Sequence, residues 1–224
     1  MGTASTMACI TETLGMALPG TAAIPAIHAD RLRAAEASGA QAVHLAQIDR
    51  DKQLTPKKII TPASVENALR ILLAVGGSTN AIIHLTAIAG RLGIPIPLQQ
   101  LNKLSDETPV LIDLKPTGDH YMEDLFKAGG LGVVLRELKP LLNLECLSVT
   151  GETLDERLQS EPAYVNREVV RSFDQPIQKM GGLVSLFGSL APGGAILKRS
   201  AADPTLFESE GKAVVFKSLE DLAN

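Results

Sequence analysis

Apolar residues recur at helical spacing through the first 145 or so positions, between proline and glycine breaks. Thr61 and Pro62 suit the cap and first position of a helix. This helix should end at Gly76–Gly77, which leave a glycine elbow before the next one. Its apolar face is formed by Val65, Leu69, Leu72 and Leu73.

A second helix should follow the elbow directly. Ser78 can cap it, and Gly93 and Pro95 should end it. The apolar stripe of this helix consists of Ile82, Leu85, Ile88, Ala89 and Leu92. Further on, residues 110–114 (VLIDL) predict a short buried strand, followed by a turn at 115–118 and a helix that runs to Gly129–Gly130. This mixture predicts an α/β fold that is heavily helical.

The last 60 residues have a different pattern, with three short segments rich in aliphatic and β-branched residues. They are GGLVSLFGSLA at 181–191, GAILKR at 194–199 and KAVVFKS at 212–218, separated by turn-like APGG and DPTLFESEG, with a helix at Leu219–Ala223. Three strands make a marginal sheet. We therefore predict the incomplete start of a β-rich, barrel-like domain at 166–224 after a helical domain at 1–165, with the junction between Ser160 and Pro176.

Composition excludes several functional classes. The chain is 45% hydrophobic and 21% charged, which is typical of a globular protein. A net charge of −4 and only 3% aromatic residues argue against a nucleic-acid partner. The chain start lacks the pattern of a signal peptide, and no apolar run approaches a membrane span, so we expect a cytoplasmic protein without a membrane segment. The two cysteines, Cys9 and Cys146, are far apart, which argues against a disulfide framework or a self-contained metal site.

The glycine elbow is the first candidate for chemistry. Free N–H groups at the helix start beside Ser78, Thr79 and Asn80 can bind a carboxylate or phosphate. The alternative is an ordinary tight elbow in which Ser78 only caps its own helix. His84, four residues after Asn80, fits a core histidine better than a catalytic one.

Other polar residues have structural explanations. The hydroxyls of Thr3, Ser5 and Thr6 suit a turn that feeds a helix starting near Met7, with Cys9 buried on that helix. His120, Glu123 and Asp124 form a local cluster that is able in principle to bind a divalent metal. Adjacent acids at 123 and 124 point to different sides of a helix, so a solvated first turn is the simpler explanation. No catalytic triad, dinucleotide motif or metal-ligand spacing is present in the sequence.

Four blocks of the sequence, taken together and in order, resemble one enzyme family. They are GTASTMACITETLGMALPG at 2–20, ITPASVENALRILLAVGGSTNAIIHLTAIAGRLGI at 60–94, DLKPTGDHYMEDLFKAGGLGVVLREL at 113–138 and GGLVSLFGSLAPGGAILK at 181–198. The family contains dihydroxy-acid dehydratase, phosphogluconate dehydratase and the pentonate and gluconate dehydratases. The resemblance implies a hydro-lyase that uses an iron–sulfur cluster and magnesium to convert a 2,3-dihydroxy acid to a 2-keto acid. Family members commonly form homo-oligomers, so self-association is expected.

The same resemblance implies that residues 1–224 are an internal fragment. In the family, the cluster cysteines and part of the magnesium site precede the GTASTM block, and the remaining magnesium ligand and the proton acceptor follow position 224. No catalytic or metal-ligating residue is therefore assigned, and the chain alone is expected to be inactive. Thr3, Ser5 and Thr6 are expected beside the cluster, and Ser78, Thr79 and Asn80 near the substrate cleft.

The GTASTM block and the TAAIPAIHADR stretch at 21–31 are more similar to the sugar-acid branch than to the branched-chain amino-acid branch. Two alternatives to an enzyme fragment remain. One is a non-catalytic folded domain that binds an anionic small molecule or a partner subunit, and the other is a subunit completed by a separate chain. Sequence alone does not separate them, because the residues that would read the substrate lie elsewhere.

Overall fold

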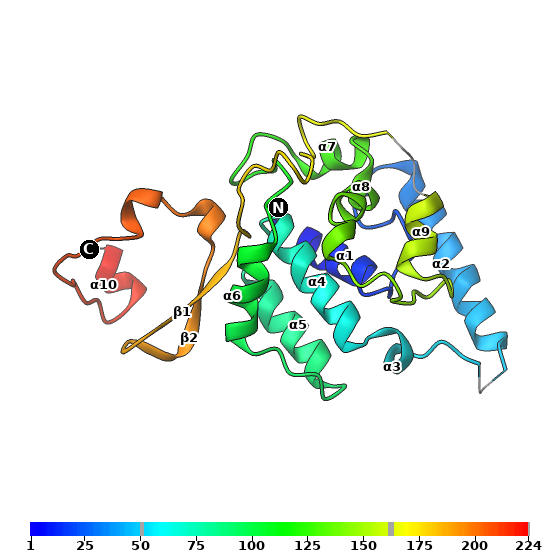
Figure 1. Ribbon diagram of the computed structural model, residues 1–224, viewed down its shortest axis with the longest axis horizontal. Helices are drawn as coiled ribbons and strands as arrows, with labels where there is room; N and C mark the ends of the chain where they lie inside the picture. Colours follow the sequence, from blue (N-terminus) through cyan, green and yellow to red (C-terminus); the bar gives the residue numbers. More distant parts are fainter. Residues whose placement is uncertain (50–51, 161–163, 224) are drawn as a thin grey trace.

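The computed structural model describes residues 1–49, 52–160 and 164–223. Helix α1 (Thr3–Thr13) lies at the centre of the N-terminal region and packs against α4 (Pro62–Ala74) and α5 (Asn80–Gly90) (Figure 1). Helix α6 (Leu98–Glu107) contacts α4 on one side and the C-terminal hairpin on the other. The helices predicted on either side of the elbow are thus both present.

The start of α4 shows why this helix forms where the sequence predicts it. Thr61 Oγ1 accepts a hydrogen bond from the Ser64 N–H at 3.2 Å, and Ser64 Oγ accepts one from the Thr61 N–H at 2.8 Å. Pro62, at the first helical position, loses no intrahelical hydrogen bond. The reciprocal cap satisfies two N–H groups that the first turn would otherwise leave unpaired.

Helix α4 separates two apolar clusters. Ile71 and Ala74 belong to one of them, which extends to the helices after residue 121. Leu69 and Leu72 belong to the other, which includes apolar residues of α1, α5 and α6. Because both sides of α4 are covered, this helix is the main support of the N-terminal region.

The remaining helices surround this centre. Helices α7 (Met122–Lys127) and α8 (Gly130–Glu137), the 3₁₀ turn η1 (Lys139–Leu141) and α9 (Leu154–Ser160) cover one cluster. Helix α3 (Pro56–Ile59) is a single turn before α4. Helix α2 (Ala29–Gln47) lies along the outside and has no buried residue. None of the helices in the described part of the chain is long and apolar enough to span a membrane.

The prediction of a regular strand at 110–114 was wrong. The segment is extended and mostly buried, but within the described part of the chain it forms only isolated bridges, to Gln178, Val170 and His120. The partners are loops that meet the segment one residue at a time, as in the hydrogen bond from Asp113 N to Val169 O (2.9 Å). The sequence predicted the burial correctly, but a ladder also requires a continuous neighbour.

The C-terminal region contains one antiparallel hairpin, β1 (Val184–Gly188) and β2 (Ala191–Leu197). The short turns η2 (Arg199–Ala201) and η3 (Pro204–Leu206) follow, and then helix α10 (Leu219–Ala223). The described residues therefore do not form a barrel, and the expected third strand at 212–218 is unpaired. The APGG segment lies inside β2, where Gly194 has a φ of +96°, so the hairpin turns at 189–190 and not at APGG. Residues 161–163 of the predicted junction lie outside the described residues, and the domain boundary stays a prediction.

Candidate functional site

The start of α1 and the glycine elbow meet in a hydroxyl and amide cluster, hereafter the Thr3–Ser78–Asn80 cluster. Thr3 Oγ1 lies 2.9 Å from Ser78 Oγ, and the side-chain amide of Asn80 donates to Thr3 Oγ1 at 3.1 Å. Thr6 Oγ1 accepts a hydrogen bond from the Ser78 N–H at 3.1 Å. Two segments about 75 residues apart in sequence, each singled out separately, thus form one arrangement.

Helix α1 begins at Thr3, earlier than the predicted start near Met7. Thr3, Ser5 and Thr6 therefore lie in the first turn of the helix and not in a preceding turn. The hydroxyls of Ser5 and Thr6 donate to the Gly2 carbonyl at 3.1 and 2.8 Å. These bonds stay inside the helix, which explains why the hydroxyl-rich run does not prevent it from forming.

The predicted elbow residues have different roles. Ser78 Oγ accepts from the Asn80 N–H at 3.3 Å, although the N-cap position itself is occupied by Thr79, whose side chain makes no capping bond. A Cβ on Gly77 would lie 2.7 Å from both Leu72 Cδ1 and Thr6 Cγ2. Gly77 is therefore needed for the elbow to press against α1, which brings the cluster together.

The cluster can bind a polar ligand but has no group suited to proton transfer near neutral pH. Thr3 and Ser78 are half-buried and Asn80 is exposed, so solvent reaches the cluster. The N–H groups of Ser78 and Asn80 and those of the next two residues already have acceptors, so the expected free N–H groups are not available at these positions. The hydroxyl and side-chain amide groups are the remaining hydrogen-bonding partners for a carboxylate or hydroxyl. Ser5 bonds only to its own helix, and Thr79 stands at the N-cap without a capping bond, so these two predicted residues are weaker candidates.

The C-terminal region reaches the same elbow, which sequence reasoning missed. The Ser200 N–H donates to the Gly182 carbonyl at 3.2 Å, and a Cβ on Gly76 would lie 3.3 Å from Ser200 Oγ. Burial lowers the pKa of the neighbouring Lys198 amine. The signal available in the sequence was the KRS run directly after a strand-like segment, but its partner at the elbow is a tertiary contact.

Neither cysteine has the character of a metal-binding or nucleophilic thiolate. Cys9 is fully buried, as expected. Burial, and to a smaller extent the negative charge of Glu12, raises the pKa of the Cys9 thiol to about 12. Burial also raises the pKa of the half-buried Cys146 thiol, whose sulfur lies 3.5 Å from the side-chain nitrogen of Asn67.

The local cluster of His120 and its acidic neighbours separates into independent contacts. His120 Nδ1 lies 3.6 Å from an Asp113 oxygen, Glu123 pairs with Lys127 at 2.6 Å, and Asp124 accepts from the Tyr121 N–H at 2.8 Å. Within 1–49, 52–160 and 164–223, His, Cys, Asp and Glu side chains form no group of three or more able to hold a metal ion. These residues therefore do not fit the ligand set of an iron–sulfur cluster or a magnesium ion.

His84 also differs from its prediction. It was expected to be a core residue, but it lies on the exposed side of α5. The apolar stripe of α5 that faces the core is formed by Ala81, Ile82, Leu85 and Ala89. Position 84 lies off that stripe, so solvent accommodates the imidazole.

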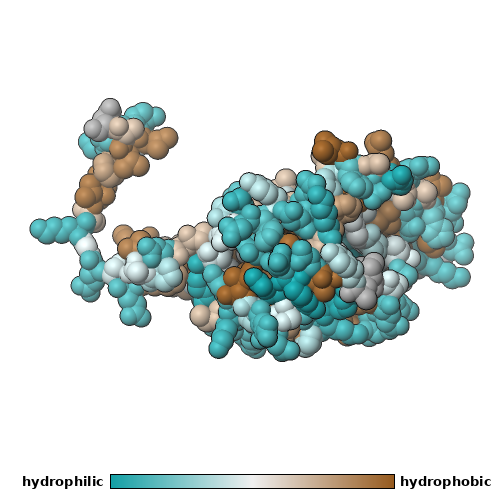
Figure 2. Space-filling model, turned by 90° about the horizontal axis from the view of Figure 1, so that it is seen from above, coloured by the Kyte–Doolittle hydropathy of each residue, from teal (hydrophilic) through white to brown (hydrophobic). Residues whose placement is uncertain are grey.

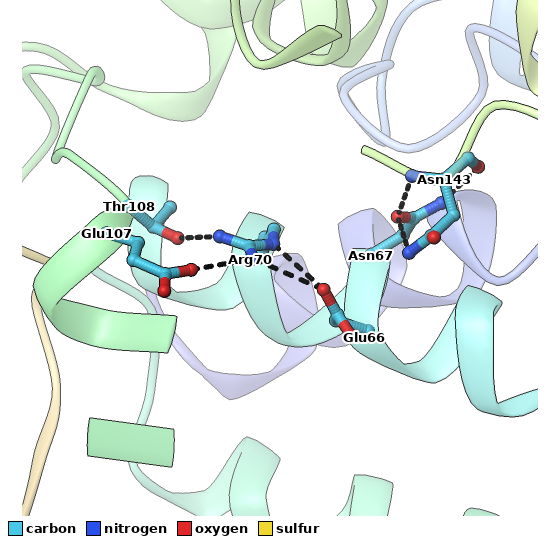
Figure 3. Close-up of polar contacts among 6 residues, drawn as sticks. All are labelled: Glu66, Asn67, Arg70, Glu107, Thr108 and Asn143. Atoms are coloured by element: carbon cyan, nitrogen blue, oxygen red, sulfur yellow. Dashed lines mark hydrogen bonds and ion pairs between the residues drawn. The ribbon is translucent and has the colours of Figure 1, made fainter. Parts of the chain in front are cut away.

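A polar network holds α4, and hence the elbow, in place (Figure 3). The buried guanidinium of Arg70 bonds to Glu66 at 3.2 Å, to Glu107 at 3.0 Å and to Thr108 at 3.1 Å. Three residues earlier on α4, the Asn67 side chain accepts a hydrogen bond from the Asn143 N–H at 2.8 Å and donates one to the Asn143 carbonyl at 2.9 Å. Both groups fix side chains that would otherwise be buried without partners.

Comparisons with known proteins agree on one family. The profile for the dihydroxy-acid/6-phosphogluconate dehydratase N-terminal family matches residues 1–157, and the corresponding C-terminal profile matches 168–224. The chain is 43% identical over 223 residues to a dihydroxy-acid dehydratase of Caldanaerobacter subterraneus subsp. tengcongensis, and 45% identical over 224 residues to one of Caldicellulosiruptor bescii. Each match covers 99% of this chain but only 39% and 40% of those relatives, respectively. The chain therefore belongs to the dihydroxy-acid/6-phosphogluconate dehydratase family.

Proposed function

We propose that this chain is part of a hydro-lyase that removes water from a 2,3-dihydroxy acid to give a 2-keto acid, and that it helps to bind the acid. The observation that supports this role is the convergence of Thr3, Ser78 and Asn80 from two segments that both belong to the family's sequence blocks. The family supplies the reaction class, and the cluster supplies a place for a polar ligand.

The proposed contribution of these residues is binding and orientation. A substrate carboxylate beside the cluster accepts a hydrogen bond from the Asn80 side-chain amide, which has a second N–H besides the one bonded to Thr3. The hydroxyls of Thr3 and Ser78 either donate to the carboxylate or accept from a substrate hydroxyl. The iron–sulfur cluster and magnesium implied by the resemblance need ligands other than the described residues, so we propose that the chain alone is inactive.

Two substrate groups are compatible with this proposal. The similar proteins named above are dihydroxy-acid dehydratases, which favours a simple dihydroxy acid. The GTASTM block and the stretch at 21–31 favour a sugar acid, the branch predicted from the sequence. An aldonate is itself a 2,3-dihydroxy acid, so both substrates present the same carboxylate and adjacent hydroxyls.

A chimeric enzyme tests the proposal. The matching segment of the Caldicellulosiruptor bescii relative is replaced by this chain, and 2-keto acid formation is measured under anaerobic conditions with dihydroxyisovalerate, pentonates and hexonates. We expect turnover by the chimera and none by the isolated chain. Asn80→Leu should lower kcat/KM by about ten- to a hundredfold, the effect of losing a hydrogen bond to a charged group.

Ser5→Ala is the matched control, because Ser5 lies in the same turn as Thr3 but bonds only to Gly2. Equal losses for the two variants would point to a general disturbance of α1 and α5. A chimera that folds but binds the acid without any turnover would support the alternative, a non-catalytic binding domain. Turnover by the isolated chain would show that it carries a complete metal centre.

A further inference from the structure

The backbone that leads into the hairpin is seated between α4 and α6. The Gly181 N–H donates to the Ser105 carbonyl at 2.7 Å, and the Gly182 N–H donates to the Leu73 carbonyl at 3.0 Å. Leu73 lies in the last turn of α4, where carbonyl groups have no partners within the helix. The C-terminal region therefore caps the helix that ends at the glycine elbow.

This glycine pair also packs directly against the elbow. A Cβ on Gly182 would lie 2.7 Å from the Gly76 Cα, and a Cβ on Gly181 would lie 2.9 Å from both Leu73 Cβ and Ser105 Oγ. Only glycine allows so close an approach at these two positions. The pair thus sets how near the C-terminal region comes to the elbow.

Arg199, which follows β2, holds the glycine pair in place. Its guanidinium donates to the Gly181 carbonyl at 3.2 Å from Nε and 3.0 Å from Nη2, and Nη2 also donates to Ser105 Oγ at 2.9 Å. Gly181 and Ser105 are buried, so the guanidinium satisfies polar groups that are withdrawn from water. The next residue, Ser200, donates its N–H to the Gly182 carbonyl at 3.2 Å, which ties both ends of the hairpin to the same point.

The contacts continue from the elbow into the Thr3–Ser78–Asn80 cluster. Ser78 follows Gly76 by two residues, and its N–H donates to Thr6 Oγ1 while its hydroxyl lies 2.9 Å from Thr3 Oγ1. Because so few planar peptide units separate Gly76 from Ser78, a displacement of the one moves the other. Packed backbone groups therefore connect Arg199 with the cluster.

We propose that Arg199 positions the acid-binding cluster by holding Gly181–Gly182 against the elbow, so that Ser78 and Asn80 keep the orientation in which they bind a carboxylate. This inference rests on the proposed function above and adds a residue of the C-terminal region to it. Arg199 acts through the glycine pair and not on the acid, so it is a positioning residue. A site whose groups are already oriented loses less conformational entropy when it binds the acid.

Hydrogen exchange of the full chain tests the connection without any acid present. Arg199→Gln should accelerate exchange of the Ser78 and Asn80 N–H groups by at least about tenfold, because the elbow opens more often. An equal acceleration throughout α1 and α4 would overturn the inference, since it would report a general loss of stability.

Asn102→Ala is the matched control for Arg199→Gln. The Asn102 amide closes the edge of β1, where it donates to the Ser185 carbonyl at 2.9 Å and accepts from the Ser185 N–H at 2.7 Å. Both variants therefore loosen the hairpin from α6, but only Arg199→Gln releases the glycine pair. Asn102→Ala should leave exchange at the elbow unchanged, and a matching acceleration there would overturn the inference.

A second pair of variants displaces the elbow while the guanidinium is kept. Gly182→Ala places a methyl group 2.7 Å from the Gly76 Cα, whereas the added methyl of Gly188→Ala, on β1, meets nothing within 4 Å in the described part of the chain. Gly182→Ala should reproduce the faster exchange at Ser78 and Asn80, and Gly188→Ala should not. Unaltered exchange at the elbow in Gly182→Ala would overturn the inference.

Kinetics of the chimera connect the elbow with the acid. Arg199→Gln should raise KM by about tenfold and change kcat by less than about threefold, since it weakens binding more than chemistry. Arg199→Lys keeps the charge but not the two-pronged donor, so its KM should lie between those of the wild type and Arg199→Gln. An unchanged KM in Arg199→Gln beside a lowered kcat/KM in Asn80→Leu would overturn this inference alone. An unchanged kcat/KM in Asn80→Leu would overturn the proposed function, and this inference with it.

Discussion

The N-terminal region and the C-terminal arm, which is residues 207–223 and extends from the main body in Figure 2, contain similar aliphatic residues in opposite surroundings. Leu72 in α4 is fully buried between helices, whereas Val215 in the arm is 86% exposed. The difference lies in the number of facing surfaces, since α4 has neighbours on both sides and the arm has none among the described residues. Hydrophobicity alone therefore does not bury a segment, and a partner surface of matching shape is also required.

The polar interactions of the two regions differ in the same way. Glu12 is 1% exposed and bonds to the buried Arg157 and to the N–H groups of Gly20 and Ala22, at 2.9 and 2.7 Å. The acids of the arm, such as Glu208, are exposed. Removing the Glu12 carboxylate should therefore lower the free energy of unfolding strongly, whereas removing an acid of the arm should leave it nearly unchanged.

The largest expected effect comes from breaking the buried pair of α1 and α9. Glu12→Ala removes the carboxylate that bonds to the buried Arg157 guanidinium and to the Gly20 and Ala22 N–H groups, and should lower the free energy of unfolding by about 3 to 5 kcal/mol. Urea unfolding followed by circular dichroism measures this change. Glu208→Ala in the arm is the control and should leave the midpoint unchanged, and comparable losses in both variants would contradict the contrast between the regions.

A cavity in the core should have the next largest effect. Leu72→Ala removes a fully buried side chain and should cost about 2 to 5 kcal/mol. Val215→Ala in the arm should change the free energy of unfolding by less than about 0.5 kcal/mol, because the side chain is exposed. Both variants are compared by denaturant unfolding at the same protein concentration.

The hydrogen bonds between Asn102 of α6 and Ser185 of β1 join the two regions, and removing them should destabilise the hairpin more than the helical core. Asn102→Ala leaves the Ser185 N–H and carbonyl without partners and should cost about 1 to 3 kcal/mol, mostly as easier opening of the hairpin. Hydrogen exchange at Ser185 should become faster while exchange in α4 stays the same. Gln99→Ala, an exposed change on the same helix, should alter neither rate, and a uniform acceleration would show that the hairpin unfolds together with the core.

Alkaline pH should weaken the core through Cys9 by a smaller amount. The thiol pKa is raised from 9.0 to about 12 in the folded chain, so above pH 9 the unfolded chain loses this proton while the folded chain keeps it. The contribution of the protonated Cys9 thiol to the free energy of unfolding is therefore complete below pH 9. It falls by at most about 1.4 kcal/mol per pH unit between pH 9 and 12.

The measurement is the free energy of unfolding between pH 8 and 10 for the wild type and for Cys9→Ala. Other titrating groups are common to the two chains, so only the difference in slope reports on Cys9. The variant is expected to have the flatter profile at alkaline pH. Parallel profiles would show that the thiol ionises equally in both states.

Sequence patterns predicted the elements that depend on local chemistry. Thr61 and Pro62 fixed the start of α4 because capping bonds form within one turn. The glycine elbow was predicted because helices end where left-handed backbone is needed, and Gly76 has a φ of +54°. Errors arose where a neighbour decided the outcome, as for residues 110–114, which lie against loops, and His84, which lies off the core stripe.

The sequence by itself determined where α4 begins, where the elbow lies and which family the four blocks resemble. Only the tertiary structure decided that Thr3 and Asn80 share a hydrogen bond, that Asn102 closes the edge of β1 and that the segment at 212–217 stays unpaired. The physical reason is the distance along the sequence over which each kind of interaction acts. Caps, turns and apolar periodicity act over a few residues, whereas strand pairing and side-chain clusters depend on surfaces that are distant in sequence and meet only when the chain folds.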